Sequence, residues 1–96
     1  MPICFIVPVD STGSCIEKIN SSIYGITTSI FTKDKSIEKI EEIASKIDVG
    51  TVNVNTWEVT DGITYSGRKR SGKGFSFSPL SFNNIVRTKA VSFHQQ

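Results

Sequence analysis

Two cysteines and one histidine are the side chains in this sequence best suited to act as nucleophile, base or metal ligand. A catalytic thiolate needs solvent exposure and a nearby positive charge or base. Cys4 lies within the apolar run Ile3–Val7 and Cys15 on the apolar stripe of a predicted helix, so both are expected to be small buried side chains. His94 has no other ligand at metal-binding spacing, and we expect it to be solvated. The residues therefore predict no catalytic centre, cofactor-binding residue or metal site.

A glycine-rich basic run, Gly67–Gly74 (GRKRSGKG), partly matches the phosphate-loop pattern G-x-x-x-x-G-K-[ST]. Gly74 occupies the Ser/Thr position, so the hydroxyl that would bind magnesium is missing, and the preceding segment is not a hydrophobic strand. Its four cations could contact nucleic acid, but without a wider basic face such contact is weak and salt-sensitive. A solvated loop is the favoured interpretation, and nucleotide and nucleic-acid binding are disfavoured.

The elements that must position these residues alternate along the chain. Runs of apolar and β-branched residues predict three strands: Ile3–Val7, buried on both faces, Ile26–Thr32 and Thr51–Asn55. Between them, apolar residues recur at helical spacing in two segments. The first helix is expected to follow an N-cap among Asp10, Ser11 and Thr12 and to end at Asn20–Ser22; its stripe is Cys15, Ile16 and Ile19.

The second helix is capped by Asp34 or Ser36 and stopped by Gly50. Its isoleucine face is expected to pack against the sheet that contains Val52 and Val54, and its glutamates to face solvent. The members of that apolar face are Ile37, Ile40, Ile43, Ala44 and Ile47.

The second half of the sequence is less regular. Thr56 to Pro79 has no periodicity and predicts a long ordered loop, a type of segment that is often functional. Leu80–Ile85 predicts a short helix with Phe82 and Ile85 facing inward, and Lys89–Phe93 a last strand. The order of elements predicts an α/β fold with a mostly parallel sheet and two main helices. These elements are too few to cover both sheet faces, which indicates a piece of a larger domain or a chain that needs partners.

Composition narrows the class of protein further. With 38% hydrophobic and 21% charged residues the chain is globular in type, and a net charge of +2 is too small to indicate a nucleic-acid or membrane partner. The longest apolar run is too short to span a bilayer and has no features of a secretory signal. A reduced, cytoplasmic setting is therefore expected.

Four motifs, in order and over nearly the whole chain, resemble the aldehyde dehydrogenase superfamily. They are similar to the family's Asn-x-x-x-Tyr-Gly-Leu-x-x-x-Val-Phe-Thr, Gly-Thr-Val-x-Val-Asn, Gly-x-Lys-x-Ser-Gly-x-Gly and closing Lys-x-Val patterns. In this sequence they are Asn20–Thr32, Gly50–Asn55, Gly67–Gly74 and Arg87–Val91. Each motif alone is weak, but their order and spacing make the match specific.

The resemblance implies a function. The family oxidises aldehydes to acids with NAD or NADP, through a nucleophilic cysteine in a Gly-Gln-x-Cys context that this sequence lacks. It implies that residues 1–96 form a single C-terminal segment of the catalytic domain, without the dinucleotide-binding domain and with no cofactor expected for this chain alone. It also places Asn55, Thr60, Asp61 and Tyr65 in the substrate pocket, although Thr64 stands where the family has proline.

Three functions remain open at this point. The first is a fragment or remnant of an NAD(P)-dependent aldehyde dehydrogenase, inactive alone. The others are a small non-catalytic oligomerisation or binding module, and a subunit that complements a separate N-terminal polypeptide. Because the predicted edge strand Lys89–Phe93 has no obvious neighbour, we also expect a homo-oligomer, most simply a dimer, with Ala90–Phe93 near its interface.

Overall fold

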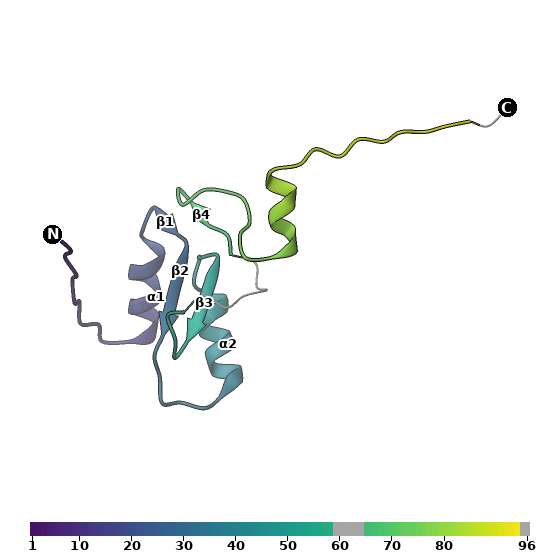
Figure 1. Cartoon of the computed structure of the whole chain (residues 1–96). Helices are drawn as coiled ribbons and strands as arrows, with labels where there is room; N and C mark the ends of the chain where they lie inside the picture. Colours follow the sequence, from purple (N-terminus) through teal and green to yellow (C-terminus); the bar gives the residue numbers. More distant parts are fainter. Residues whose placement is uncertain (59–64, 95–96) are drawn as a thin grey trace.

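The computed structural model describes residues 1–58 and 65–94 as a small body with two extended arms (Figure 1). In chain order its elements are α1 (Thr12–Asn20), β1 (Tyr24–Gly25), β2 (Thr27–Ile30), α2 (Ile37–Ser45), β3 (Thr51–Val54), β4 (Arg68–Lys69) and the 3-10 helix η1 (Pro79–Asn84). The radius of gyration is 18.8 Å, against about 13 Å for a compact domain of roughly 100 residues. The difference arises because the arms extend away from the body.

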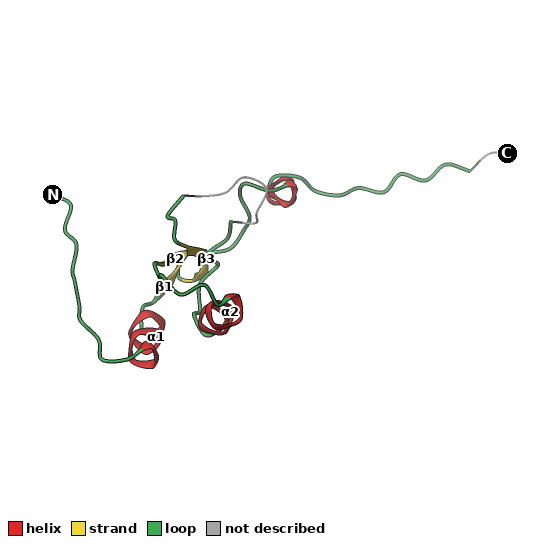
Figure 2. Cartoon of the chain, turned by 90° about the horizontal axis from the view of Figure 1, so that it is seen from below, coloured by secondary structure: helices red, strands yellow, loops and turns green. Residues whose placement is uncertain are grey.

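The centre of the body is a strand–helix–strand unit. Strands β2 and β3 are parallel, in a register that runs from Thr27 opposite Thr51 to Ile30 opposite Val54, and α2 connects them. Helices α1 and α2 lie on the same side of this strand pair (Figure 2). The strands predicted at Ile26–Thr32 and Thr51–Asn55, and the helix between them, are confirmed.

A second strand pair, β1 with β4, is antiparallel, with Tyr24 opposite Lys69 and Gly25 opposite Arg68. The described strands therefore form two separate two-stranded sheets, one parallel and one antiparallel. The α/β class is confirmed, but a mostly parallel sheet is not. The sequence did not indicate β4, because a two-residue strand carries no periodicity.

Both helix starts follow the predicted capping chemistry. The Ser11 hydroxyl accepts a hydrogen bond from the Ser14 N–H at 3.1 Å, and the Ser36 hydroxyl accepts one from the Lys39 N–H at 3.4 Å. Helix α2 ends at Ser45, several residues before the predicted stop at Gly50. Gly50 instead allows the backbone at Ser66 to approach closely.

Two predicted strands were wrong. Neither Ile3–Val7 nor Lys89–Phe93 is a strand in the structure, and both are exposed, with Phe5 at 86% and Phe93 at 88%. The physical reason is that a strand must hydrogen-bond to a neighbour, and the described chain places no partner beside either arm. Cys4, predicted to be buried, is exposed for the same reason.

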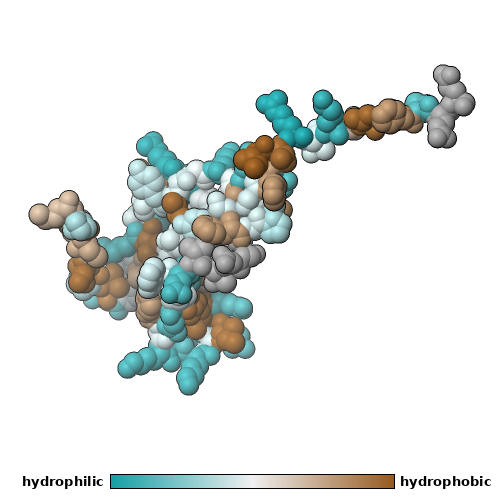
Figure 3. Space-filling model, in the orientation of Figure 1, coloured by the Kyte–Doolittle hydropathy of each residue, from teal (hydrophilic) through white to brown (hydrophobic). Residues whose placement is uncertain are grey.

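The core is small. Among the described residues the buried hydrophobic side chains are Ile47, at 4% exposure, and Val49, at 8%. Of the predicted apolar face only Ile47, just after the end of α2, is buried; Ile40, Ile43 and Ala44 are half-buried, and Ile37 is 69% exposed. Phe82 and Ile85, predicted to face inward, are also exposed. Apolar surface extends over the body and the arms in Figure 3.

Candidate functional site

A hairpin spanning residues 65–76, here called the Tyr65–Ser76 hairpin, carries the best described part of the predicted substrate pocket. At its base, the Tyr65 N–H donates to the Ser76 carbonyl at 3.0 Å, and the Ser76 N–H donates to the Tyr65 carbonyl at 2.9 Å. The half-buried Tyr65 ring meets the Phe77 ring edge-on, with centroids 5.7 Å apart and planes at 89°. Such aromatic pairs contribute about 0.5–1.5 kcal/mol beyond their buried area.

The sequence did not identify Phe77 as a site residue. The available signal was the alternation of aromatic residues at Phe75 and Phe77 directly after the glycine-rich run. Thr60 and Asp61, also predicted for the pocket, lie outside the described residues. Their predicted role stays a prediction, as does that of Tyr65.

The tip of the hairpin is bound to the corner between α1 and β1. The Arg70 N–H donates to the Ile23 carbonyl at 3.0 Å, and the Ser71 hydroxyl accepts the Gly25 N–H at 2.8 Å. Within the tip, the Ser71 N–H donates to the Arg68 carbonyl at 3.1 Å, closing a turn. The glycine-rich basic run is therefore a turn anchored by hydrogen bonds, and most of its residues are exposed, as expected for a solvated loop.

Lys69 makes the longest-range contacts of this tip. Its ammonium donates to the carbonyls of Asn20, at 2.9 Å, and Ser22, at 3.0 Å, at the C-terminal end of α1. A cation at this end satisfies free carbonyls and interacts favourably with the helix dipole. The Lys69 Nζ also lies 3.8 Å from the Asp48 Oδ2, and the Arg68 Nη1 lies 3.3 Å from the Asp48 Oδ1.

Two glycines allow backbone segments to approach one another closely, Gly50 beside the hairpin and Gly25 beside Asp48. A Cβ added at Gly50 would overlap the Ser66 carbonyl oxygen, and one at Gly25 would lie 2.8 Å from the Asp48 carbonyl oxygen. Heavy atoms cannot approach so closely, so a side chain at either position would push backbone segments apart. The glycine of the Gly-Thr-Val motif is thus explained by close packing against the hairpin, and that of the Tyr-Gly motif by close packing against Asp48 and then Arg68.

Asn55, the remaining predicted pocket residue, stands at the end of β3 with a positive φ of 55°. Its N–H donates to the Ile30 carbonyl at 2.8 Å, and its side-chain oxygen accepts the Thr32 N–H at 2.8 Å. Asparagine tolerates this left-handed conformation better than most residues. In the described structure Asn55 joins the ends of β2 and β3, and a role in the substrate pocket stays a prediction.

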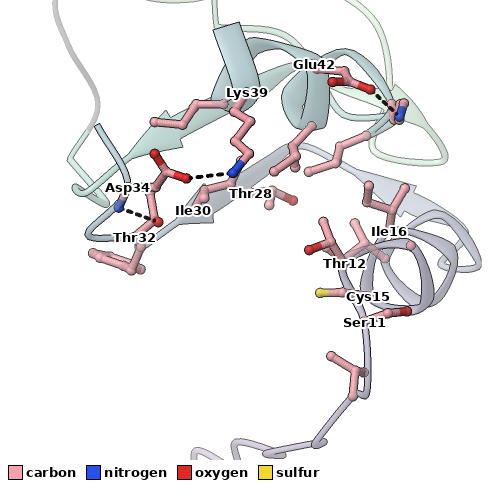
Figure 4. A pocket seen from close by; sticks show the side chains of 18 of the residues that line it. Ser11, Thr12, Cys15, Ile16, Thr28, Ile30, Thr32, Asp34, Lys39 and Glu42 are labelled. Carbon is pink, nitrogen blue, oxygen red and sulfur yellow. Dashed lines mark hydrogen bonds and ion pairs between the residues drawn. The ribbon is translucent and has the colours of Figure 1, made fainter. Parts of the chain in front are cut away.

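A groove of about 1150 Å³ separates α1 from α2, with β2 at its floor. Figure 4 shows Cys15 and Ile16 of α1 on one side and Lys39 on the other.

Two carboxyl groups near this groove have shifted pKa values. The hydrogen bond from the Ser36 N–H lowers the pKa of Asp34, and Lys39 has a smaller effect in the same direction. Lys46 lowers the pKa of Glu42. These are surface ion pairs, which stabilise proteins little. Glu42 faces solvent, as predicted.

The described residues offer neither a metal site nor a membrane-spanning helix. Within residues 1–58 and 65–94, no group of three or more His, Cys, Asp or Glu side chains could hold a metal ion. No helix among the described elements is long and apolar enough to cross a membrane. The exposed His94 lies on the C-terminal arm.

A parallel strand–helix–strand unit with an antiparallel hairpin bound against it defines a protein of the α/β class. The chain belongs to the aldehyde dehydrogenase family, because the model "Aldehyde dehydrogenase family" matches residues 1–91. The resemblance inferred from the four motifs is therefore confirmed.

Curated relatives are consistent with this assignment. The chain is 34% identical to the putative aldehyde dehydrogenase AldY of Bacillus subtilis, over 99% of this chain and 20% of that protein. It is 33% identical to human mitochondrial 10-formyltetrahydrofolate dehydrogenase, over 80% of this chain and 8% of that protein. The chain thus spans at most about a fifth of the length of these relatives.

Solved structures agree. Succinic semialdehyde dehydrogenase from Streptococcus pyogenes, in complex with NADP+, has a TM-score of 0.74 and 30% identity, over 91% of this chain and 19% of that chain. An aldehyde dehydrogenase from Bacillus cereus, in complex with NAD+, has a TM-score of 0.77 and 30% identity, over 88% of this chain and 17% of that chain. The fold of this chain is therefore that of one section of an aldehyde dehydrogenase, and these family members bind NAD+ or NADP+.

Proposed function

We propose that this chain supplies a structural and substrate-pocket section of an NAD(P)-dependent aldehyde dehydrogenase, and that it does not oxidise aldehydes alone. The observation that carries the proposal is the absence of a Gly-Gln-x-Cys nucleophile from a sequence that otherwise matches the family over residues 1–91. Without a positioned thiolate no covalent intermediate forms. The chain's own cysteines lie on an exposed arm and on α1.

The described residues do not fit a nicotinamide dinucleotide. The one glycine-rich basic run is a turn whose Arg70 and Ser71 N–H groups already donate to backbone carbonyls. Helix η1 begins several residues after this run, so the run does not lead directly into a helix N-terminus as a phosphate-binding loop does. The cofactor therefore belongs with the partner in this proposal, and this chain takes part in no hydride-transfer step.

The partner we propose is a polypeptide carrying the dinucleotide-binding domain and the nucleophile of the family. Support comes from the apolar surface that the described chain leaves open. Many large hydrophobic side chains are exposed, including Ile3, Phe5 and Ile6 of the N-terminal arm, at 73%, 86% and 94%. Where exposed apolar side chains of this kind gather, they mark an interaction site or an aggregation liability.

Purified chain, assayed with several aldehydes and with both NAD and NADP, tests the first half of this proposal. We expect no turnover above that of the buffer. Turnover that disappears in Cys4→Ser or Cys15→Ser would contradict it, because one of the chain's own thiols would then be the nucleophile.

A second candidate function is a small homo-oligomeric module. It is favoured by the C-terminal arm, where the extended segment Lys89–Phe93 exposes Val91 by 69% and Phe93 by 88%. An unpaired segment of this composition can pair with a second copy. Light scattering coupled to size exclusion decides the matter: an assembly that dissociates when residues 89–96 are deleted supports the module, and one species at 10.6 kDa excludes it.

A further inference from the structure

We propose that Lys69 is a positioning residue that fixes Tyr65 by holding the tip of the Tyr65–Ser76 hairpin against the end of α1. The proposal rests on the proposed function only where Tyr65 is said to line the aldehyde pocket. The geometric part depends on the contacts of the chain itself.

The contacts of Lys69 link three segments that are distant in sequence. Its ammonium donates to carbonyls at Asn20 and Ser22 and lies beside Asp48, which follows α2. The Lys69 side chain is only 23% exposed, whereas that of Arg68 is 57% exposed. Because exposed ion pairs are screened by water, Lys69 contributes more than Arg68 to holding the tip, beside the hydrogen bonds made by Arg70 and Ser71.

The backbone at Lys69 gives independent support. Its φ is +57°, a left-handed conformation that is unfavourable for a residue with a side chain. A glycine would adopt this conformation without strain, and Lys69 retains it while its ammonium reaches the end of α1. Persisting strain of this type is found where the surrounding structure fixes the residue.

Backbone hydrogen bonds of the hairpin connect Lys69 at the tip to Tyr65 at the base. Lys69 lies in β4 beside β1 (Figure 1), and its carbonyl accepts the Gly72 N–H at 3.4 Å as the chain turns back. The returning segment reaches Ser76, which exchanges two backbone hydrogen bonds with Tyr65. Phe77 follows directly and packs against the Tyr65 ring. A shift of the tip therefore moves the aromatic pair at the base.

Amide hydrogen exchange on the full 96-residue chain, followed by NMR, tests this inference. The variant is Lys69→Met, which keeps the length and apolar stem but removes the ammonium. We expect about a tenfold loss of protection at the Tyr65 and Ser76 amides, on the order expected for one charge-assisted hydrogen bond. The Thr51 amide donates to the residue before β2 and the Asn55 amide donates to β2 itself, so both should keep their protection.

Two further variants separate positioning from general stability. Lys69→Arg retains a cation that can donate to both carbonyls, so it should restore most of the protection. Lys73→Met removes an exposed cation from the same loop and should behave as the unmodified chain. Equal protection at Tyr65 and Ser76 in Lys69→Met and the unmodified chain would overturn the inference. So would an equal loss at every amide, or no protection at these two amides in the unmodified chain.

The exchange experiment contains no aldehyde, cofactor or partner, so its result does not depend on catalysis. A chain that passes it but never supports turnover with a partner would disprove the proposed function and leave the positioning role intact. In an enzyme assembled with the partner, Lys69→Met should raise KM for the aldehyde about tenfold. KM for the nicotinamide cofactor should stay unchanged, and an equal rise in both constants would contradict a role through Tyr65.

Discussion

The side chain of Asn20, at the end of α1, binds the backbone on both sides of Ile47: its oxygen accepts the Asp48 N–H at 2.8 Å and its amide group donates to the Lys46 carbonyl at 2.8 Å. One carboxamide thus joins the C-terminal ends of two helices that are far apart in sequence. These two bonds flank Ile47, the most buried isoleucine among the described residues, which explains why an asparagine begins the first family motif.

Replacing this residue tests the relationship. Asn20→Ala removes both hydrogen bonds and should lower the free energy of unfolding by about 1–3 kcal/mol, because it leaves two backbone groups without their partner. Urea denaturation followed by circular dichroism measures the change. Asn83→Ala, on the exposed helix η1, is the matched control and should shift the midpoint little. Equal midpoints for both variants would show that Asn20 does not join the helices.

Gly50 offers a second test. Gly50→Ala would place a methyl group where the Ser66 carbonyl oxygen lies, so the hairpin must separate from the start of β3. We expect a loss of stability well beyond the ~1 kcal/mol typical of backbone effects at glycine, with loss of protection at the Tyr65 amide. Gly13→Ala is the control: it lies in α1 with open space around it and should stabilise the chain by about 0.5–1 kcal/mol. A well-tolerated Gly50→Ala would contradict the close approach.

The apolar face of α2 should respond unequally to truncation. Ile47→Ala removes a buried side chain and should cost about 2–5 kcal/mol, whereas Ile37→Ala removes an exposed one and should cost much less. The comparison of the two denaturation midpoints measures how far the core extends. Similar losses in both variants would mean that the whole face is covered in solution.

The sequence predicted the elements that carry their own periodicity or capping residues. Both α-helices and the strands β2 and β3 follow from Ser11, Ser36 and the apolar spacing, because these signals act within a few residues. The hairpin could not be predicted in this way, since its stability comes from Lys69, Ser71 and Gly50, which contact residues more than fifteen positions away. Its family motif was recognised, but not its physical role.

In the two arms, the sequence predicted strands that the structure does not have. The apolar run Ile3–Val7 has the composition of a buried strand, yet it is exposed and unpaired in the structure. Hydrophobic composition indicates that a segment is suited to burial, but a strand forms only where a neighbouring strand supplies hydrogen bonds. Of the candidate site, Tyr65 lies in an ordered aromatic pair, while Thr60 and Asp61 lie outside the described residues.

We propose that this chain contributes to aldehyde oxidation only together with the rest of an aldehyde dehydrogenase. The direct measurement is NAD(P)H formation from an aldehyde while the chain is titrated into a fixed amount of a family polypeptide. That polypeptide carries the dinucleotide-binding domain and the Gly-Gln-x-Cys nucleophile but lacks the matching C-terminal section. We predict no activity from either component alone and activity that rises to a plateau as the chain is added. Titration that produces no activity, while the polypeptide's own C-terminal section restores it in parallel, would show that this chain does not complete the enzyme.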